Sequence, residues 1–329
     1  MITAEPHSSN TCIVIVTYHP QPYIKERIDE LSQKFDSIIV VDNNSSTDEH
    51  EYLKNEKIVL IKNNTNLGIA QALNQGFEKA EELGYIWVIT MDQDSRLMPQ
   101  AMEVFLNIYH SYPNKNQLAM IAGNFFIDEG IPTYPCSTNG MLYSQTDTAI
   151  TSGCLTNVSV WKEIGGFDNN FFIDNVDDEF CLRASLYNYK TITTNQIILD
   201  HQIGEMKIWY YNRIFKFIAP KKISPDFYLS KSQRIFHKLN FFRYKLRTYG
   251  PFRLPYNEHS PTRWYYQGRN MFTLYSKYRK TNKTWCKEAL RIHRRRFIIM
   301  MIVEKSRFRK AAMYFKGIFH GIIKRTGPI

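Results

Sequence analysis

The chain has 329 residues, of which 43% are hydrophobic and 14% aromatic, a composition that builds folded domains and excludes a disordered or low-complexity protein. Its charge is divided unevenly: residues 1–204 contain 12 Lys and Arg against 26 Asp and Glu, whereas residues 205–329 contain 30 against 5. This division predicts an acidic catalytic half and a basic half that meets an anionic surface.

The cysteines and the apolar runs exclude further classes of protein. Five cysteines are scattered without a Cys-x-x-Cys pair, which argues against a zinc site or a disulfide framework and favours a reducing compartment. The longest unbroken apolar run is residues 297–303. A membrane-spanning helix needs roughly 20 apolar residues, so we expect none.

The N-terminal part alternates apolar, β-rich runs with segments of helical spacing. The expected strands are residues 12–17, 37–41, 57–62 and 85–91, and the expected helices are residues 23–34 and 69–83. Alternation of this kind predicts an α/β protein with a mostly parallel central sheet that helices cover on both faces.

Beyond this part the pattern is less regular. The expected segments are a strand at 120–126, a loop at 127–141, helices at 159–164 and 177–186, and a strand within 189–199. Five prolines then interrupt residues 220–261, and two helices follow, at 264–278 and from 285 to residue 324. We predict a catalytic domain at residues 1–225 and a basic helical extension at residues 226–329.

The most informative short motif is Asp92-Gln93-Asp94-Ser95, which follows the apolar run at residues 85–91. Two carboxylates at the end of a buried strand are hard oxygen ligands that suit Mg²⁺ or Mn²⁺ together with substrate phosphates. Ligands of open α/β sheets bind at the carboxyl ends of the strands. Ordinary turn aspartates are the simpler alternative.

Other expected strands also end in polar residues. Thr17-Tyr18 ends one strand and Asp42 another. A carboxylate at position 42 could accept the ring N–H of a pyrimidine base or could close an Asx-type turn. Residues 63–68 run into a helix, whose first amides could meet phosphate or could simply be capped. Neither a P-loop nor a dinucleotide-binding fingerprint is present in the sequence.

Two further acidic or basic positions are candidates for chemistry. Residues 174–179 contain four carboxylates, more than helix capping needs, and one of them in a cleft would have a raised pKa and could act as a general base. His201 follows Asp200 at another strand end. It is either a structural histidine or a metal ligand beside Asp94.

Taken in order, these motifs resemble the inverting glycosyltransferases of family 2, which have the Rossmann-like GT-A fold. The resemblance covers residues 12–205 and includes V-T-Y-H-P, V-V-D-N-N-S, N-T-N-L-G-I-A-Q-A-L-N-Q-G, M-D-Q-D-S, T-S-G-C-L, G-G-F-D-N-N-F-F-I-D-N-V-D-D-E-F-C-L-R and D-H-Q-I-G. The forms D-Q-D-S and F-I-D-x-V-D-x-E-x-C-L-R are most similar to the rhamnosyltransferase branch. That branch uses dTDP-L-rhamnose to build bacterial surface polysaccharides such as O-antigen and capsule, and it also ends in a basic helical extension.

The resemblance implies roles for individual residues. Asp42 would read the pyrimidine, Asp92 would lie near the ribose and a metal-bound water, and Asp94 would bind Mg²⁺ or Mn²⁺ with His201 as its distal partner. The nucleotide-sugar site would also include Thr17, Tyr18, Asn44, Asn66, Gly68 and Gln93.

The family's general base lies six residues before an arginine, which gives Asp177 from Arg183. The glutamate that usually precedes this base is Val176 here, so Asp178 and Glu179 remain alternatives. The implied reaction is a single displacement in which the base deprotonates an acceptor hydroxyl and the sugar is transferred with inversion.

The resemblance also implies partners and a location. The acceptor would be a lipid-linked oligosaccharide, and the protein would be cytoplasmic and peripheral on the inner face of the bacterial membrane. In residues 308–323 apolar side chains recur at helical spacing among Lys and Arg, which suits an anionic membrane surface or, alternatively, packing on the catalytic domain or a second copy of the chain. A UDP-sugar, of galactofuranose or N-acetylglucosamine, is the alternative donor. A nucleic-acid-binding protein is a distant alternative, because the basic half contains no known reader motif.

Overall fold

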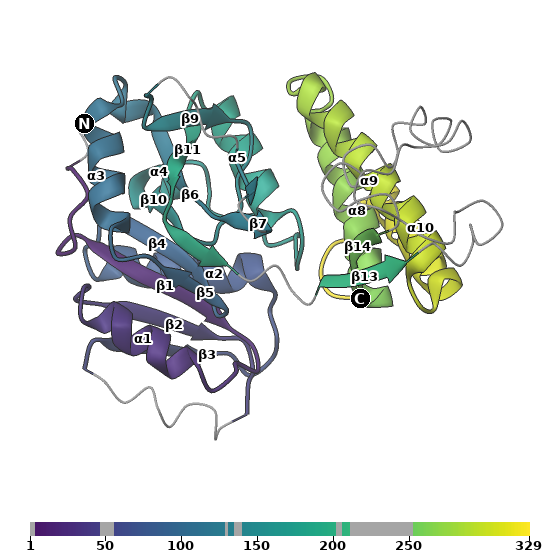
Figure 1. The fold of residues 1–329 in the computed structure, drawn as a ribbon, viewed down its shortest axis with the longest axis horizontal. Helices are drawn as coiled ribbons and strands as arrows, with labels where there is room; N and C mark the ends of the chain where they lie inside the picture. Colours follow the sequence, from purple (N-terminus) through teal and green to yellow (C-terminus); the bar gives the residue numbers. More distant parts are fainter. Residues whose placement is uncertain (1–3, 47–55, 129–130, 135–139, 202–205, 211–252) are drawn as a thin grey trace, which may run out of the picture.

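The computed structural model describes residues 4–46, 56–128, 131–134, 140–201, 206–210 and 253–329 (Figure 1). Figure 1 shows an α/β part with three long C-terminal helices beside it. The predicted domain boundary near residue 225 lies outside the described residues.

An eight-stranded sheet forms the centre of the α/β part, with strand order β3-β2-β1-β4-β10-β6-β11-β9. Its parallel half consists of β1 (Thr11–Thr17), β2 (Ile38–Asp42), β3 (Ile58–Lys62) and β4 (Trp87–Asp92). In the other half, β10 (Cys154–Asn157) runs antiparallel to both of its neighbours, β4 and β6 (Leu118–Asn124). Strand β11 (Lys190–Ile197) is parallel to β6, and β9 (Tyr143–Thr146) forms an antiparallel edge.

Successive side chains of a strand point to opposite faces of the sheet, and on the buried strands both sets are apolar, which explains why helices cover both faces. On β1, Cys12 and Val14 face a core shared with α2 (Ile69–Glu82), α4 (Val158–Glu163) and α5 (Val176–Leu186). Ile13 and Ile15 face a second core with α1 (Ile24–Ser32) and α3 (Ala101–Ser111). Strands with both faces buried show up as continuous apolar runs, which is why residues 12–17 and 85–91 were predictable.

Several short elements depart from the prediction. Helix α3 and the strands β9 and β10 were not predicted, and the expected loop at 127–141 contains the end of β7 (Phe126–Asp128) and β8 (Ile131–Pro132). Two further short strands, β5 (Ser95–Leu97) and β12 (Leu199–His201), pair outside the main sheet. Such short strands carry little periodicity of their own, so tertiary pairing decides them.

The C-terminal part begins with a hairpin of β13 (Met206–Tyr210) and β14 (Arg253–Asn257), followed by α8 (Pro261–Tyr278), α9 (Lys283–Val303) and α10 (Arg307–Ile322). The predicted single helix from 285 to 324 is wrong, because it breaks at residues 304–306. There Glu304 is buried and accepts from Lys310 Nζ at 2.8 Å and Trp264 Nε1 at 3.3 Å. This buried ion pair turns the chain back, so that α10 packs on α8.

Glycine allows α8 and α10 to approach closely. A Cβ on Gly317 would lie 2.1 Å from the Tyr265 carbonyl oxygen, and one on Gly268 would lie 2.4 Å from the Tyr314 carbonyl oxygen. Among the described residues, no helix is long and apolar enough to cross a membrane.

Candidate active site

The ends of the parallel strands form one rim of the sheet, as predicted. Thr17 and Asp42 are partners in the register of β1 with β2, and Val16 is the partner of Asp92 on β4. Thr17, Asp42 and Asp92 therefore lie at the carboxyl ends of three adjacent strands, where ligands of open α/β sheets bind.

Asp42 is buried, and its own loop orients its carboxylate. Thr17 Oγ1 donates to Oδ1 at 3.0 Å, the Ser45 amide donates to Oδ2 at 2.8 Å, and the Ser45 hydroxyl also donates to Oδ1. The carboxylate therefore closes its own loop through the amide three residues on, one residue further than in the Asx-type turn anticipated from sequence. Tyr18 and Asn44 are exposed beside it, with Asn44 at a positive φ of 76°.

The buried neighbour Asn43 ties this loop to the start of α2, a role that sequence reasoning missed. Asn43 Oδ1 accepts from the Leu67 amide at 3.0 Å, and its Nδ2 donates to the Gly68 carbonyl at 3.2 Å. A buried asparagine must find such partners, since an unpaired polar group away from water is unfavourable.

Three predicted donor-site residues are engaged by the protein itself. Gln93 accepts from the Tyr18 amide at 2.8 Å and donates to the Tyr18 carbonyl at 3.2 Å. Asn66 accepts from the Gly68 amide at 2.9 Å. Gly68 has a φ of 86°, and a Cβ there would lie 2.5 Å from the Phe172 carbonyl oxygen, to which the Ile69 amide donates at 2.7 Å. These contacts hold the loop that leads into α2, whose N-cap residue Gly68 makes no side-chain cap.

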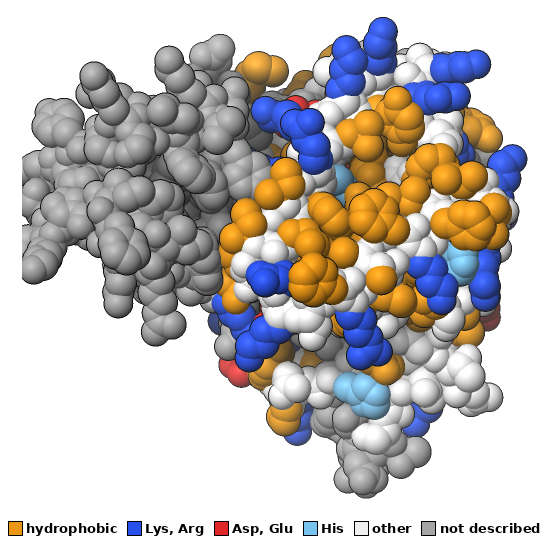
Figure 2. Space-filling model, turned by 90° about the vertical axis from the view of Figure 1, so that its right-hand side faces the viewer, with side chains coloured by type: hydrophobic (Ala, Val, Ile, Leu, Met, Phe, Trp, Pro, Cys, Tyr) orange, Lys and Arg blue, Asp and Glu red, His pale blue; other side chains and the backbone are white. Residues whose placement is uncertain are grey.

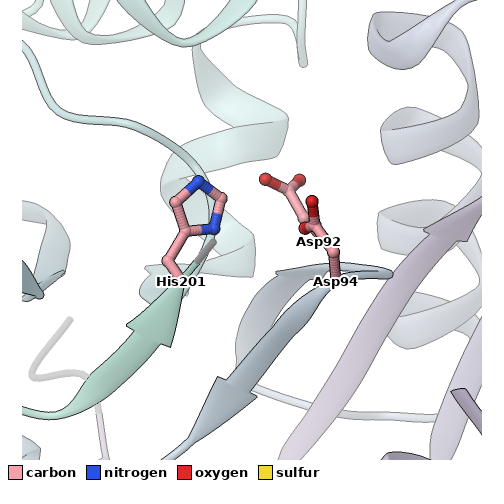
Figure 3. Close-up of side chains that lie close together, drawn as sticks. All are labelled: Asp92, Asp94 and His201. Carbon is pink, nitrogen blue, oxygen red and sulfur yellow. The ribbon is translucent and has the colours of Figure 1, made fainter. Parts of the chain in front are cut away.

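Asp92, Asp94 and His201 converge at the rim (Figure 3), with one ligand atom of each lying within 4.8 Å of the others. The antiparallel pairing of β12 with β5 sets His201 opposite Ser95, which brings the histidine beside the Asp-x-Asp motif. Two carboxylates with one imidazole suit a hard divalent cation such as Mg²⁺ or Mn²⁺. The residues therefore fit the metal site that the sequence predicted.

Two buried serines hold the histidine ring. Ser95 Oγ lies 2.6 Å from His201 Nδ1, Ser152 Oγ lies 2.8 Å from Ser95 Oγ, and the Asp92 amide donates to Ser152 Oγ at 3.1 Å. A metal ion would therefore bind His201 through Nε2 while Nδ1 contacts Ser95, the arrangement that fixes a ligating histidine. Ser152 was not predicted, although it lies in the T-S-G-C-L motif.

Burial and neighbouring negative charge raise the pKa values of aspartates at the rim. Asp92 keeps some accessible surface, but the surrounding protein removes much of the bulk water, and this burial, with the nearby Asp94 charge, raises the pKa of Asp92 to about 6. His201 and Arg263 act in the opposite direction. Burial, followed by the charges of Asp178 and Asp92, raises the pKa of Asp177 to about 8. The charge of Asp92 therefore acts on Asp177.

The three candidate bases have different surroundings. Glu179 is fully buried and is bound by Arg183 at 2.8 Å, Lys277 at 2.6 Å and Tyr278 at 2.9 Å. Burial would raise the pKa of Glu179, but these hydrogen bonds and charges lower it overall. Such a carboxylate is a structural anchor and a poor base.

Asp178 and Asp177 are the remaining candidates. Burial raises the pKa of Asp178, although Asn175 Nδ2, at 2.7 Å, and Thr148 hydrogen-bond to its carboxylate and oppose this rise. Asp177 accepts from the Asp178 amide at 3.0 Å. Among the described residues, Asp177 has fewer hydrogen-bonding side-chain partners than Asp178, which favours Asp177 as the candidate base.

Comparisons with known proteins identify the family of the chain. The model of the family "Glycosyl transferase family 2" matches residues 12–128. The chain is 32% identical over 217 residues to the dTDP-rhamnosyl transferase RfbF of Shigella flexneri, covering 61% of this chain and 72% of that protein. It is 25% identical over 194 residues to the low-salt glycan biosynthesis hexosyltransferase Agl10 of Haloferax volcanii, covering 54% of this chain and 62% of that protein.

Among solved structures, GalNAc-T7 with UDP, GalNAc and Mn²⁺ has a TM-score of 0.48 at 13% identity, covering 59% of this chain and 44% of that one. Residues 1–349 of TarS from S. aureus give 0.46 at 15% identity, covering 59% and 60%. At these TM-scores nothing about the substrate follows.

The match to the family model and to the rhamnosyl transferase, together with the α/β fold, defines a glycosyltransferase. The chain belongs to glycosyltransferase family 2, and it shares about a third of its aligned residues with a dTDP-rhamnosyl transferase.

Metal binding tests the geometry of the rim. Asp94→Ala should remove most Mn²⁺ affinity, and Ser95→Ala should lower it by ~10–100-fold because the histidine ring loses its partner. Ser95→Thr, which keeps a hydroxyl, should restore the affinity. Ser144→Ala, which removes a serine hydroxyl bonded to Asn195 near the far edge of the sheet, is the matched control. Titration of Mn²⁺ followed by electron paramagnetic resonance measures the affinity of all four variants. Unchanged affinity in Asp94→Ala would show that these residues only form turns.

Proposed function

We propose that the protein transfers L-rhamnose from dTDP-L-rhamnose to a lipid-linked glycan acceptor in the synthesis of a surface polysaccharide. The observation that carries the proposal is the convergence of Asp92, Asp94 and His201 on one rim. The charge of Asp92 also contributes to the raised pKa of Asp177. The likeness to a dTDP-rhamnosyl transferase supports the choice of donor.

The chemistry is a single displacement with inversion. Asp42, held by Thr17 and Ser45, accepts the ring N–H of the pyrimidine. Asp177 takes the proton of an acceptor hydroxyl, and the resulting oxygen attacks the anomeric carbon on the side opposite the diphosphate, whose bond to that carbon breaks. A divalent cation held by Asp94 and His201, when bound, supplies positive charge to the leaving diphosphate.

Donor preference tests the proposal. Transfer or slow hydrolysis of dTDP-rhamnose should exceed that of UDP-galactofuranose and UDP-N-acetylglucosamine by at least ~10-fold, measured as release of the nucleoside diphosphate. ADP-sugars should be inert, because the six-membered ring of adenine has no N–H to donate to Asp42. GDP-sugars should be poor donors, because the bicyclic guanine sets its ring N–H farther from the ribose than a pyrimidine does. Preference for a UDP-sugar would keep the reaction and discard rhamnose, because uracil presents the same N–H. Equal use of ADP- and dTDP-sugars would overturn the nucleotide site.

We also propose that the exposed face of α9 and α10 binds an anionic membrane surface. Figure 2 shows apolar side chains grouped between Lys and Arg on this face. The apolar group on α10 and just beyond it is Phe308 (74% exposed), Phe315 (57%), Phe319 (57%), Ile322 (55%) and Ile323 (55%). Exposed basic residues surround it, namely Lys305, Arg307, Arg309, Lys316, Lys324 and Arg325.

This mixture favours a lipid surface over another protein. Each basic residue near an anionic membrane contributes ~1 kcal/mol, and aromatic side chains suit the headgroup region. Lys310, which the sequence analysis placed within this basic segment, is not part of the face: it is buried and paired with Glu304 and Glu258. A membrane at this face would bring a lipid-linked acceptor to the enzyme.

Co-sedimentation with liposomes tests the membrane face. The wild type should bind vesicles that contain anionic phospholipid and should be released at high salt, because exposed charges are screened. Phe315→Ser with Phe319→Ser should bind several-fold more weakly. Leu186→Ser with Tyr187→Ser, which changes two residues of similar exposure on the α/β part, is the control. Equal binding by all three proteins would contradict the proposal. A wild-type dimer that only the double phenylalanine variant fails to form would instead assign this face to self-association.

A further inference from the structure

Helix α8 of the C-terminal part contacts the segment from Asn170 to Glu179, which leads into α5 and contains Asp177. The contacts are made by side chains on one face of α8. Arg263 donates to the Asp174 carboxylate at 2.9 and 3.1 Å. One turn later, the Tyr266 ring stacks on Phe172 with 5.2 Å between ring centroids and 19° between planes.

Two buried residues bind the backbone of the same segment. Asn270 Nδ2 donates to the carbonyl oxygens of Ile173 and Asp174, both at 2.8 Å. Arg269 Nη2 donates to the Asn170 carbonyl at 2.8 Å. Both residues are only 2% exposed, so Asn270 Nδ2 and Arg269 Nη2 depend on these carbonyls as partners. The other donors of Arg269 bond to Asn270 Oδ1 and to the Gly327 carbonyl.

The segment and the residues just before it also contact α2. The Ile69 amide donates to the Phe172 carbonyl at 2.7 Å. Just before the segment, Asn74 Nδ2 donates to the Phe167 carbonyl at 2.8 Å and to Asn169 Oδ1 at 2.9 Å. The segment is thus held between a helix of the α/β part and a helix of the C-terminal part.

The segment needs this support because its backbone is strained. Asp174 and Asn175 are consecutive left-handed residues, with φ of 63° and 61°. Such conformations are unfavourable for residues with a Cβ and persist where the surroundings over-determine them. The turn they form places Asp177 in the first turn of α5. Further along α5, Glu179 is held by Lys277 and Tyr278 from the end of α8.

We propose that α8 is a positioning element for the general base, with Asn270 and Arg263 as its principal positioning residues. The basic extension therefore completes the catalytic site in addition to any part it has at a membrane. This inference rests on the proposed role of Asp177, since the position of that carboxylate relative to the acceptor sets the rate.

Two variants and two measurements test the positioning role. Asn270→Ala and Arg263→Ala should lower kcat by ~10–100-fold. For Asn270→Ala, which removes no charge, KM for the donor and the affinity for dTDP with Mn²⁺ should stay within about twofold, as expected when a group acts only through geometry. Arg263→Lys, which keeps the cation beside Asp174, should retain most of kcat. Thr273→Ala is the control, because its hydroxyl bonds to the Arg269 carbonyl within α8 and not to the segment.

Hydrogen exchange followed by mass spectrometry provides a readout that needs no substrate. Amides of residues 170–179 should exchange at least ~10-fold faster in Asn270→Ala, with the strands of the central sheet unchanged, because opening becomes local. Unchanged exchange of this segment would overturn the inference, as would equal acceleration throughout the protein. If the wild type does not turn over dTDP-rhamnose, the proposed donor fails, but the exchange result still decides whether α8 orders the segment.

Discussion

Repulsion among the carboxylates at the end of the central sheet is the constraint on which the rest of the site depends. Asp92 and Asp94 lie beside one another, and the field of Asp92 reaches Asp177, which also adjoins Asp178. Partial removal from water strengthens this repulsion. A divalent cation held by these residues, and the nearby charge of Arg263, would offset this repulsion. Burial, together with the same repulsion, raises the pKa of Asp177 and so makes it a stronger proton acceptor.

The uneven charge of the sequence has a partly internal explanation. The charge pattern of the sequence predicted that the basic half meets an anionic surface. Some cations of the basic half instead bind carboxylates of the acidic half. Arg263 pairs with Asp174, and Lys277 pairs with Glu179. Other cations stay exposed around the apolar face of α10. The basic half thus meets two anionic partners, the catalytic domain of its own chain and, as we propose, a membrane.

The parts of the fold that could be predicted are those with a strong local pattern. Strands β1, β2 and β4 are continuous apolar runs that end at Thr17, Asp42 and Asp92, so their common rim was predictable from topology. The place of His201 beside Asp94 came from the family motifs, because the β12–β5 pairing that sets it there has no local pattern. The break at Glu304 was not, because a buried ion pair with Lys310 interrupts an otherwise helical pattern. Ser152 and Asn43 act through contacts with residues distant in sequence. The contacts of α8 with residues 170–179 likewise depend on packing between two halves of the chain, which no local sequence pattern predicts.

The pH dependence of transfer by the wild type and by Asp177→Asn tests the central claim most directly. Burial and neighbouring charge raise the pKa of Asp177 to about 8, and a base must be deprotonated to act. The rate of the wild type should therefore increase with pH up to about 8. Asp177→Asn should lose ~10²–10⁴-fold in kcat together with this increase, while its dTDP affinity stays within about twofold. Near-normal turnover in Asp177→Asn, with turnover lost in Asp178→Asn instead, would contradict the account.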